Sequence, residues 1–385
     1  MSDLPAAGIT IDAVELRRID LPLTTPFRTS FGTWTGRDVL LVRVLATGPA
    51  GVVEGWGECV APAEPTYSSE YTAGCEDVTR THLLPRLFAA APRHGAEVAP
   101  ALDGVEGHRM AKAAIEAATL DVELRAAGAS LAEHLGATVD RVPVGASIGI
   151  QAGDDELVAA VGRRLDEGYA RIKIKIEPGR DLGAVRAVRS AHGDDIRLQV
   201  DANGAYGPDD VSALRALDDF GLLLIEQPFP ADRLTDHADL ARVLETPICL
   251  DESITSPAVA RDARRLEAAS VLAIKPGRVG GHLAGKTIHD DCRAAGVPVW
   301  HGGMLETGVG RAANLALAAL PGFTLPGDIS AADRYWHRDI VTVPAALESD
   351  GTVRVPDGPG IGVEIDLDFL NSITTSVALH EPTRT

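Results

Sequence analysis

Residues 173–306 carry five short polar motifs at nearly constant intervals, KIK (173–175), DAN (201–203), EQP (226–228), DES (251–253) and KPG (275–277). Counted from Lys175 through Asp201, Glu226 and Asp251 to Lys275, the steps are 26, 25, 25 and 24 residues. Each motif ends a short run rich in Val, Ile or Leu, which is typical of a strand buried on both faces. Segments of helical length separate these runs. The alternation predicts a parallel sheet with crossover helices.

The polar groups stand at the C-terminal end of every predicted strand, and this placement indicates a catalytic face. In a closed (β/α)8 barrel these ends converge on one mouth, where active sites are built. The predicted fold class is therefore α/β, a (β/α)8-type barrel. Its first strand is expected over residues 142–150, its seventh over 297–300 and a short eighth over 323–325.

Three of the strand-end groups are carboxylates on successive strands. Neighbouring strands lie about 4.8 Å apart, so Asp201, Glu226 and Asp251 are expected to reach one ion. Three converging carboxylates would raise each other's pKa unless a cation neutralises them. Ligands that are all oxygen favour Mg²⁺ or Mn²⁺ over Zn²⁺, and the sequence therefore predicts a magnesium site.

In type, order and spacing, the two lysines and three acids resemble the enolase superfamily, muconate-lactonizing subgroup. Four longer strings resemble the branch that holds o-succinylbenzoate synthases and N-acylamino acid (N-succinylamino acid) racemases. They are RIKIKIEPGRD (from 171), LDESI (from 250), IKPGRVGG (from 274) and GGMLETGVGRAAN (from 302). The resemblance covers nearly the whole chain. It implies a modified TIM barrel with an N-terminal α+β capping domain, and a Lys base working with Mg²⁺.

The two catalytic candidates are Lys175 and Lys275, on predicted strands two and six, across the mouth from each other. A 1,1-proton transfer needs one base to remove an α-proton and another to deliver a proton to the opposite face. The metal would stabilise the enediolate as a Lewis acid. A lysine serving as base needs its pKa lowered toward neutrality, and a nearby cation, desolvation and the second lysine are expected to lower it. Solvated loop charges are the alternative, but five at this spacing disfavour that reading.

Further residues near the motifs are candidates for substrate contact or support. Lys173 lies two residues from Lys175, so both face the same side, with Lys173 one layer deeper or against the substrate carboxylate. Asn203 and Glu252 are interpreted as residues that support the metal ligands, and Arg278 as a residue that positions Lys275. The alternatives are a turn or cap role for Asn203 and Glu252, and an ordinary arginine at a helix start for Arg278. In the string Gly303, Met304, Leu305 and Glu306, the acid is expected either to close the polar ring at the mouth or to stabilise a helix N-terminus.

Three positions depart from close relatives of the family that the chain resembles. His301 stands where a cysteine is expected, and Pro62 where a methionine is expected, and both should line the substrate side-chain pocket. His301 could also titrate near pH 7, although substrate contact is the favoured role. Asp328 ends strand eight without the second acid that dipeptide-epimerising relatives use for the α-ammonium group, which disfavours a free-amine dipeptide substrate.

The N-terminal residues predict a second domain. Residues 9–22, 38–46 and 51–58 alternate as antiparallel strands, and residues 69–90 and 105–127 have helical periodicity. Expected boundaries are 1–130 for the capping domain, 131–326 for the barrel and 327–385 for a segment that packs back on the capping domain. A loop at about 23–34 is interpreted as a substrate lid, with Phe27, Arg28 and Phe31 contacting ligand. The alternative is a loop that packs its aromatic rings on its own domain.

Composition limits the possible partners and compartment. The chain has 385 residues and a formal net charge of −19, which argues against nucleic acid and anionic membranes as partners. No secretion signal or run of 18 apolar residues is found, and the four scattered cysteines are expected to be reduced, so a cytoplasmic protein is expected. The family implies a homo-oligomer with a small-molecule carboxylate substrate.

The function predicted from these features is Mg²⁺-dependent removal of the α-proton of a carboxylate. Racemisation of N-acylamino acids, using Lys175 and Lys275, is the leading hypothesis. The runner-up is the syn-dehydration of o-succinylbenzoate synthase, in which Lys175 is the base and Lys275 a stabilising cation. Muconate cycloisomerisation and a non-catalytic metal-binding barrel are more distant alternatives.

Overall fold

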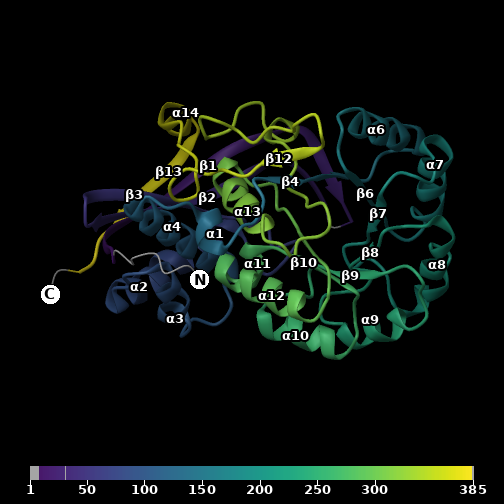
Figure 1. Ribbon diagram of the computed structural model, residues 1–385, viewed down its shortest axis with the longest axis horizontal. Coiled ribbons are helices and arrows are strands. Elements are labelled where there is room, and N and C mark those ends of the chain that lie inside the picture. Colours follow the sequence, from purple (N-terminus) through teal and green to yellow (C-terminus); the bar gives the residue numbers. More distant parts are fainter. Residues whose placement is uncertain (1–7, 31, 384–385) are drawn as a thin grey trace.

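A sheet of seven parallel strands forms the centre of the protein (Figure 1), in the order β11-β10-β9-β8-β7-β6-β5. The structure is a computed structural model, and it describes residues 8–30 and 32–383. The strands are Gly145–Ile148 (β5), Arg171–Lys175 (β6), Leu198–Asp201 (β7), Ile225–Glu226 (β8), Ile248–Leu250 (β9), Val271–Ile274 (β10) and Val299–His301 (β11). Nearly every residue in them is buried, as expected for strands covered on both faces.

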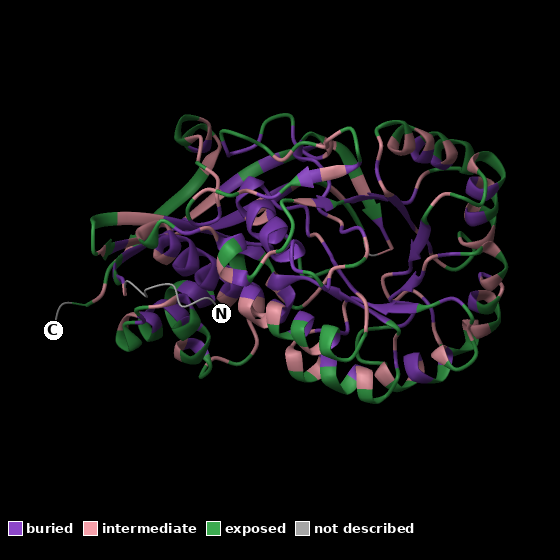
Figure 2. Cartoon of the chain, viewed as in Figure 1, coloured by how far each residue is buried: buried purple, intermediate pink, exposed green. Residues whose placement is uncertain are grey.

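Crossover helices surround the strands as an arc in Figure 1. They are Asp154–Asp166 (α6), Leu182–His192 (α7), Val211–Arg215 (α8), Leu234–Ala241 (α9), Pro257–Arg265 (α10), His282–Ala294 (α12) and Gly308–Ala318 (α13). Figure 2 shows the buried residues on the strands and the exposed ones on the outward faces of the helices. Between β7 and β8 the expected segment of helical length is not one continuous helix, because α8 is a short helix between two 3-10 turns, Pro208–Asp210 (η3) and Asp218–Phe220 (η4).

The predicted eighth strand is reduced to isolated contacts. Phe323 makes a parallel bridge with Val299 of β11, and Gly327 makes one with Val144, beside β5. Asp328 N also donates to His301 O at 2.8 Å, and Gly145 N donates to Gly327 O at 2.8 Å. This segment therefore joins the two edges of the parallel sheet without forming a regular strand.

An antiparallel sheet in the order β13-β1-β2-β3 lies beside the barrel (Figure 1). Its strands are Thr10–Thr29 (β1), Gly32–Gly48 (β2), Gly51–Cys59 (β3) and Thr374–His380 (β13). The helix Arg109–Ala127 (α4) packs on β2 and β3. It lies so close that a methyl group at Gly55 or Gly57 would clash with the α4 backbone, which explains glycine at these positions.

Shorter elements complete the structure. The predicted helix over 69–90 is divided into Thr72–Val78 (α1), a π-helical turn Thr79–Leu83 (η1) and Leu84–Ala90 (α2), followed by Gly95–Glu97 (η2) and Val98–Leu102 (α3). The others are Leu131–Leu135 (α5), Arg141–Pro143 (β4), Pro276–Val279 (α11), Ala332–Arg334 (η5), Thr352–Arg354 (β12) and Leu367–Ser372 (α14). β12 pairs with β4, at the start of the barrel.

The lid predicted as a loop over residues 23–34 is instead a β-hairpin. β1 continues to Thr29, and the pairing of Pro22 with Gly36 is followed directly by that of Phe27 with Trp34. The register shift between them bulges β1 and hides the strand from a simple alternation pattern. The Thr and aromatic residues of the segment are good strand formers, which is the physical reason for the correction.

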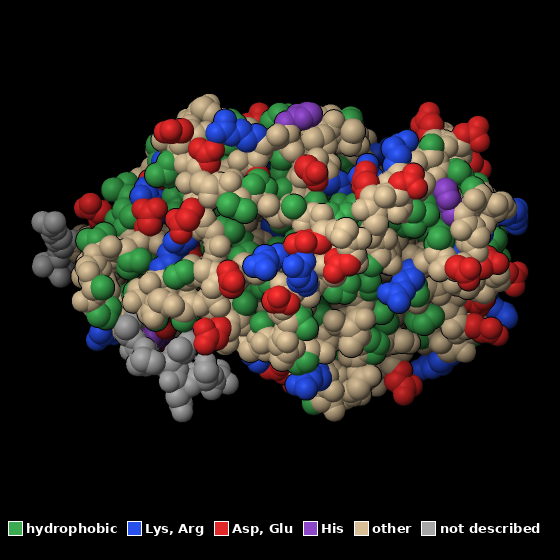
Figure 3. All heavy atoms as spheres, turned by 45° about the horizontal axis from the view of Figure 1, so that its top comes forward, with side chains coloured by type: hydrophobic (Ala, Val, Ile, Leu, Met, Phe, Trp, Pro, Cys, Tyr) green, Lys and Arg blue, Asp and Glu red, His purple; other side chains and the backbone are tan. Residues whose placement is uncertain are grey.

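The fold class is confirmed as an α+β capping domain beside a barrel of parallel strands, and the exact domain boundaries stay a prediction. None of the helices among the described residues has the length and apolarity to cross a membrane. On the face drawn in Figure 3, acidic and basic side chains are interspersed and do not separate by sign. That face therefore offers no broad basic surface, in line with the net charge of −19.

Candidate active site

The C-terminal strand ends bring the five predicted residues to one side of the barrel. Strand register places Lys175 beside Asp201 and Asp201 beside Glu226. Asp251 follows the last residue of β9, and Lys275 follows the last residue of β10. Asp201, Glu226, Asp251 and Lys275 are buried, and Lys175 is partly buried.

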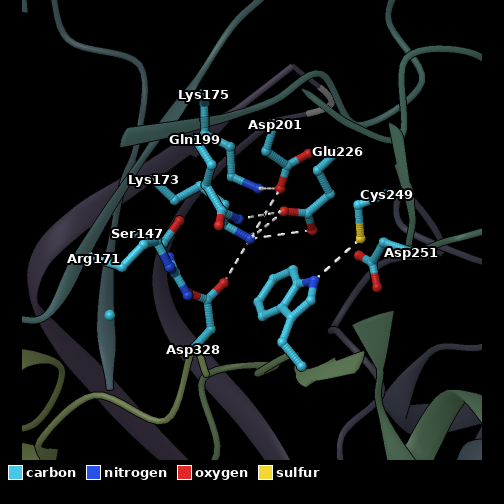
Figure 4. A network of polar contacts seen from close by, with 12 residues as sticks. Ser147, Arg171, Lys173, Lys175, Gln199, Asp201, Glu226, Cys249, Asp251 and Asp328 are labelled. Atoms are coloured by element: carbon cyan, nitrogen blue, oxygen red, sulfur yellow. Dashed lines mark hydrogen bonds and ion pairs between the residues drawn. The ribbon is translucent and has the colours of Figure 1, made fainter. Parts of the chain in front are cut away.

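The ammonium group of Lys173 is at the centre of the network (Figure 4). Its Nζ lies 3.2 Å from Asp201 Oδ2, 2.9 Å from Glu226 Oε2 and 2.5 Å from Asp328 Oδ2. Burial opposes its charge, but Asp328 and the two other carboxylates outweigh burial and raise the pKa of Lys173. Arg171 holds the other oxygen of Asp328 at 2.8 Å. This buried cluster therefore carries both charge signs in close balance.

Lys175 has different partners from its neighbour. Its Nζ donates to Asp201 Oδ2 at 2.5 Å and to Asn203 Oδ1 at 2.9 Å. Asn203 in turn donates to Glu252 Oε1 at 2.8 Å. Burial, with the nearby charge of Asp251, raises the pKa of Glu252 to about 7. Asn203 therefore bridges the amine and an acid, as a supporting residue would.

Lys275 is fixed by groups from both domains. Its Nζ donates to Asp251 Oδ2 at 2.7 Å and to the hydroxyl of Tyr67 at 3.1 Å. Arg278 also pairs with Asp251, and it donates to Tyr67 at 3.2 Å and to the Ile254 carbonyl at 2.7 Å. Burial raises the pKa of Tyr67 to about 12, so its hydroxyl stays protonated.

The lowered pKa expected for a catalytic lysine is not found for Lys275 in this arrangement of side chains. Burial does oppose its charge, but the Asp251 carboxylate outweighs burial, so the pKa of Lys275 lies above its usual value. The expectation rested on a nearby cation, desolvation and the second lysine, and it did not include a direct ion pair between Lys275 and Asp251. Lys275 is therefore an ammonium ion in this arrangement, a proton donor before it is a base.

A cavity opens over these groups. Its floor holds Lys173, Lys175, Lys275 and Asn203, with Asp328 and Ser147 beside them. Residues 303–306, which contain the predicted Gly303, Met304, Leu305 and Glu306, form one wall. The β1–β2 hairpin contributes Phe27, Thr29 and Trp34, and Tyr67 and Tyr335 complete the lining. Both candidate bases thus face one enclosed space.

His301 is not brought to the cavity, so the expectation of substrate contact is wrong. The ring of the preceding residue, Trp300, faces the barrel interior, 4.7 Å from Lys173 Nζ. Successive strand residues point to opposite faces, so His301 points outward, where its ring lies 5.9 Å from that of Phe323. Burial lowers the pKa of His301 to about 3, so it does not titrate near pH 7.

Three other predicted contacts have different outcomes. Pro62 is buried but does not line the cavity, and its backbone carbonyl accepts a hydrogen bond from Thr72 N in the capping domain. Arg28 is exposed and reaches Glu177 at 3.9 Å, away from the cavity lining. Phe31 lies outside the described residues. Arg278 and Glu252 support the site from behind the cavity wall.

The donor chemistry suits a hard cation, although the side chains are now paired otherwise. Within residues 8–30 and 32–383, no three His, Cys, Asp or Glu side chains are grouped as around a metal ion. Ammonium and guanidinium groups lie against Asp201, Glu226 and Asp251 instead. Burial, with the nearby charge of Asp201, raises the pKa of Glu226. A cation shared by Asp201 and Glu226 would compete with Lys173 for the same oxygens.

Sequence reasoning missed several residues of the site. Tyr67 and Trp34 line the cavity and Arg37 lies behind it, yet all three come from the capping domain, outside the 25-residue repeat. Asp328 was considered only as an ammonium ligand, whereas both of its oxygens face cations. Tyr67 lies in a Pro-rich segment between β3 and α1. An aromatic ring in such a segment was the one feature of the sequence that could have indicated its role.

Comparison with known proteins places the whole chain in one family. Residues 13–136 match the mandelate racemase / muconate lactonizing enzyme N-terminal domain, and residues 156–369 match the enolase C-terminal domain-like family. An N-succinylamino acid racemase from Amycolatopsis is 55% identical over 95% of this chain and 98% of its own. An o-succinylbenzoate synthase from Geobacillus kaustophilus is 45% identical over 98% of this chain and 100% of its own. A crystal structure of an enolase superfamily member from Listeria innocua superposes with a TM-score of 0.92 and is 37% identical. The match covers 97% of this chain and 100% of the Listeria chain.

Proposed function

Because the chain belongs to the mandelate racemase / muconate lactonizing enzyme family of the enolase superfamily, we propose that it racemises N-succinylamino acids by moving the α-proton. The racemase from Amycolatopsis, similar over almost the full length of both chains, supports this choice of reaction. The substrate is then a small carboxylate with an acylated amine. Its α-carbon would lie between the two lysines.

The observation that carries the proposal is the pair Lys175 and Lys275 facing one cavity from different strands. β6 and β10 are separated in the sheet by β7, β8 and β9, so the two amines approach a ligand from different sides. One amine can then accept the α-proton while the other donates a proton to the opposite face. Inversion needs two such groups, and both are held by hydrogen bonds before a substrate arrives.

Asp201, Glu226 and Asp251 are the residues that would hold Mg²⁺, or Mn²⁺ in its place. A bound Mg²⁺ would supply positive charge beside the substrate carboxylate, where negative charge develops as the α-proton leaves. Lys173 lies against two of these acids and is placed to contribute positive charge to the same carboxylate. Phe27, Trp34 and Tyr67 close the cavity over it and exclude water.

A second candidate function is o-succinylbenzoate synthase. Relatives with that name reach 45% identity over nearly the full chain, so the same site geometry is compatible with both reactions. In this case one lysine removes the proton and the other stays a cation that stabilises the anionic intermediate. Both candidates start with the same proton abstraction, and they differ in whether Lys275 must transfer a proton.

The test uses the purified protein with Mg²⁺ in D₂O and each enantiomer of N-succinylphenylglycine in separate samples. Loss of the α-proton signal is followed by NMR, with optical rotation measured in parallel. Exchange and racemisation from both enantiomers are expected. Exchange from one enantiomer only would move the assignment to the synthase, and no exchange from either would reject the proposed substrate.

A further inference from the structure

Three separate segments of the cavity wall converge on one buried side chain, Arg37 of β2. Arg37 is 2% exposed. Its Nη1 donates to the Met304 carbonyl at 3.1 Å, and its Nη2 donates to the carbonyls of Val60 and Ala61 at 3.1 and 3.3 Å. Its guanidinium group also lies 5.5 Å from the ring centre of Trp34. The hairpin, the segment leading to Tyr67 and the loop after β11 therefore meet at one group.

The loop after β11 depends on external hydrogen bonds, because its backbone is strained. Leu305 has φ of +58°, a left-handed conformation that is unfavourable for a side chain of this size. Arg37 holds the Met304 carbonyl before it, and the Glu306 side chain accepts from Met304 N at 2.9 Å. Arg311 donates to the Glu306 carbonyl after it at 2.8 Å. Such strain persists only when the surroundings fix it from both sides.

The chemistry of the contact requires a guanidinium group. Three carbonyl acceptors are reached by two terminal nitrogens of a planar fork, which a lysine ammonium on a flexible stem does not reproduce. Burial lowers the pKa of Arg37, and the nearby carboxylates of Glu58 and Glu306 oppose this shift in part. Arg37 therefore combines fixed direction with buried charge at the junction between the hairpin and the barrel.

We propose that Arg37 is a positioning residue that sets the shape of the substrate pocket, and so the preference among substrate side chains, by holding Met304, the Tyr67 segment and Trp34 in one arrangement. The hydrogen bonds of Arg37 go to backbone carbonyls and not to the candidate bases. Lys175 is held by Asp201 and Asn203. Lys275 is held by Asp251 and Tyr67. Its effect falls on substrate fit more than on proton transfer. The claim about substrate preference rests on the proposed racemase function, whereas the claim about positioning does not.

The kinetic test compares Arg37→Met and Arg37→Lys with Arg43→Met. Arg43 is a matched control, because it lies on the same strand with its guanidinium group 5.3 Å from the Trp56 ring and lines no part of the cavity. With N-succinylphenylglycine, KM is expected to rise by about tenfold in Arg37→Met, from loss of charged hydrogen bonds that fix the wall. kcat should change less than KM, and the kcat/KM preference for this substrate over N-succinylalanine should shrink. Arg37→Lys should give an intermediate result, and Arg43→Met should match the wild type.

Hydrogen exchange of the backbone amides tests positioning without relying on activity. Residues 60–71 and 302–307 are expected to lose protection in both Arg37 variants, while residues 10–14 at the far end of the sheet and the Arg43→Met protein stay unchanged. Unchanged protection at both segments, or a fall in kcat alone, would overturn the positioning role. An inactive wild type with the expected exchange pattern would overturn the racemase assignment and leave the positioning role standing. If Arg37→Met fails to fold, Arg37→Lys supplies both readouts.

Discussion

At the scale of single residues, the two lysines differ in their partners and should differ in their consequences. Lys175 is held by Asp201 and Asn203, and Lys275 by Asp251 and Tyr67. Replacing either lysine leaves a cation beside its acid, because Lys173 still contacts Asp201 and Arg278 still contacts Asp251. Neither substitution creates an unpaired buried charge, so both variants are expected to fold.

For Lys175→Met and Lys275→Met, racemisation is expected to fall by about 100-fold to 10,000-fold, the usual contribution of a general acid or base. Each single variant should still exchange the α-proton of one enantiomer in D₂O, and the two variants should differ in which one. NMR of both enantiomers measures this directly. If both enantiomers still exchange in either variant, another group serves that face of the substrate.

At the scale of elements, the β1–β2 hairpin contributes Phe27, Thr29 and Trp34 to the cavity lining. Phe27 lines the cavity and pairs with Trp34 across the hairpin, whereas its neighbour Arg28 is exposed. Adjacent strand residues point to opposite faces, so only one of the two can contact a ligand. The hairpin therefore offers a substrate contact and an internal control side by side.

Phe27→Ala is expected to raise KM for N-succinylphenylglycine by about tenfold, because the ring would lose apolar contact with the substrate. Arg28→Ala, which removes an exposed ion pair at 3.9 Å, should leave KM within about twofold. Steady-state kinetics on both variants, with the urea midpoint as a check on folding, measures the difference. Equal effects from the two substitutions would show that the hairpin does not contact substrate through Phe27.

At the scale of the whole molecule, buried acids of the capping domain join it to the barrel. Glu116 of α4 accepts from Leu283 N at 3.1 Å, at the start of α12. Glu58 of β3 accepts from the Thr307 hydroxyl at 2.6 Å and from Gly310 N at 3.0 Å, at the start of α13. Each carboxylate thus satisfies free N–H groups at a helix N-terminus. The two domains are held together by polar groups that titrate.

Burial raises the pKa of Glu116 from its ordinary 4.5 to about 7. Between about pH 4.5 and 7 the folded state keeps a proton that the unfolded state has lost, so stability falls as pH rises through this window, by about 3 kcal/mol. Glu116→Gln should remove this part of the pH dependence and keep an acceptor for Leu283. Urea unfolding at several pH values measures it, with the exposed Glu106→Gln as a control. An unchanged pH slope in Glu116→Gln would contradict the assignment.

The sequence was most informative where structure repeats. Lys175, Asp201, Glu226, Asp251 and Lys275 stand at a fixed place in successive βα units, so periodicity alone predicted that they would meet. Tyr67 and Arg37 reach the site only through the packing of one domain on another, which no local pattern encodes. The hairpin was misread because a bulge after Pro22 breaks its alternation. The charge state of Lys275 depends on an ion-pair distance, and a sequence does not contain distances.

The pairing of β13 with β1 has a consequence for the order in which the protein is made. His380 pairs with Val14, so two segments that lie far apart in the sequence meet in one sheet. During translation, β1 leaves the ribosome well before β13 and keeps an uncovered edge, open to pairing with other chains, until the strands and helices of the barrel have also emerged. The nascent chain therefore carries an incomplete capping sheet throughout the synthesis of the barrel. Binding of a chaperone to that open edge would be most useful before release.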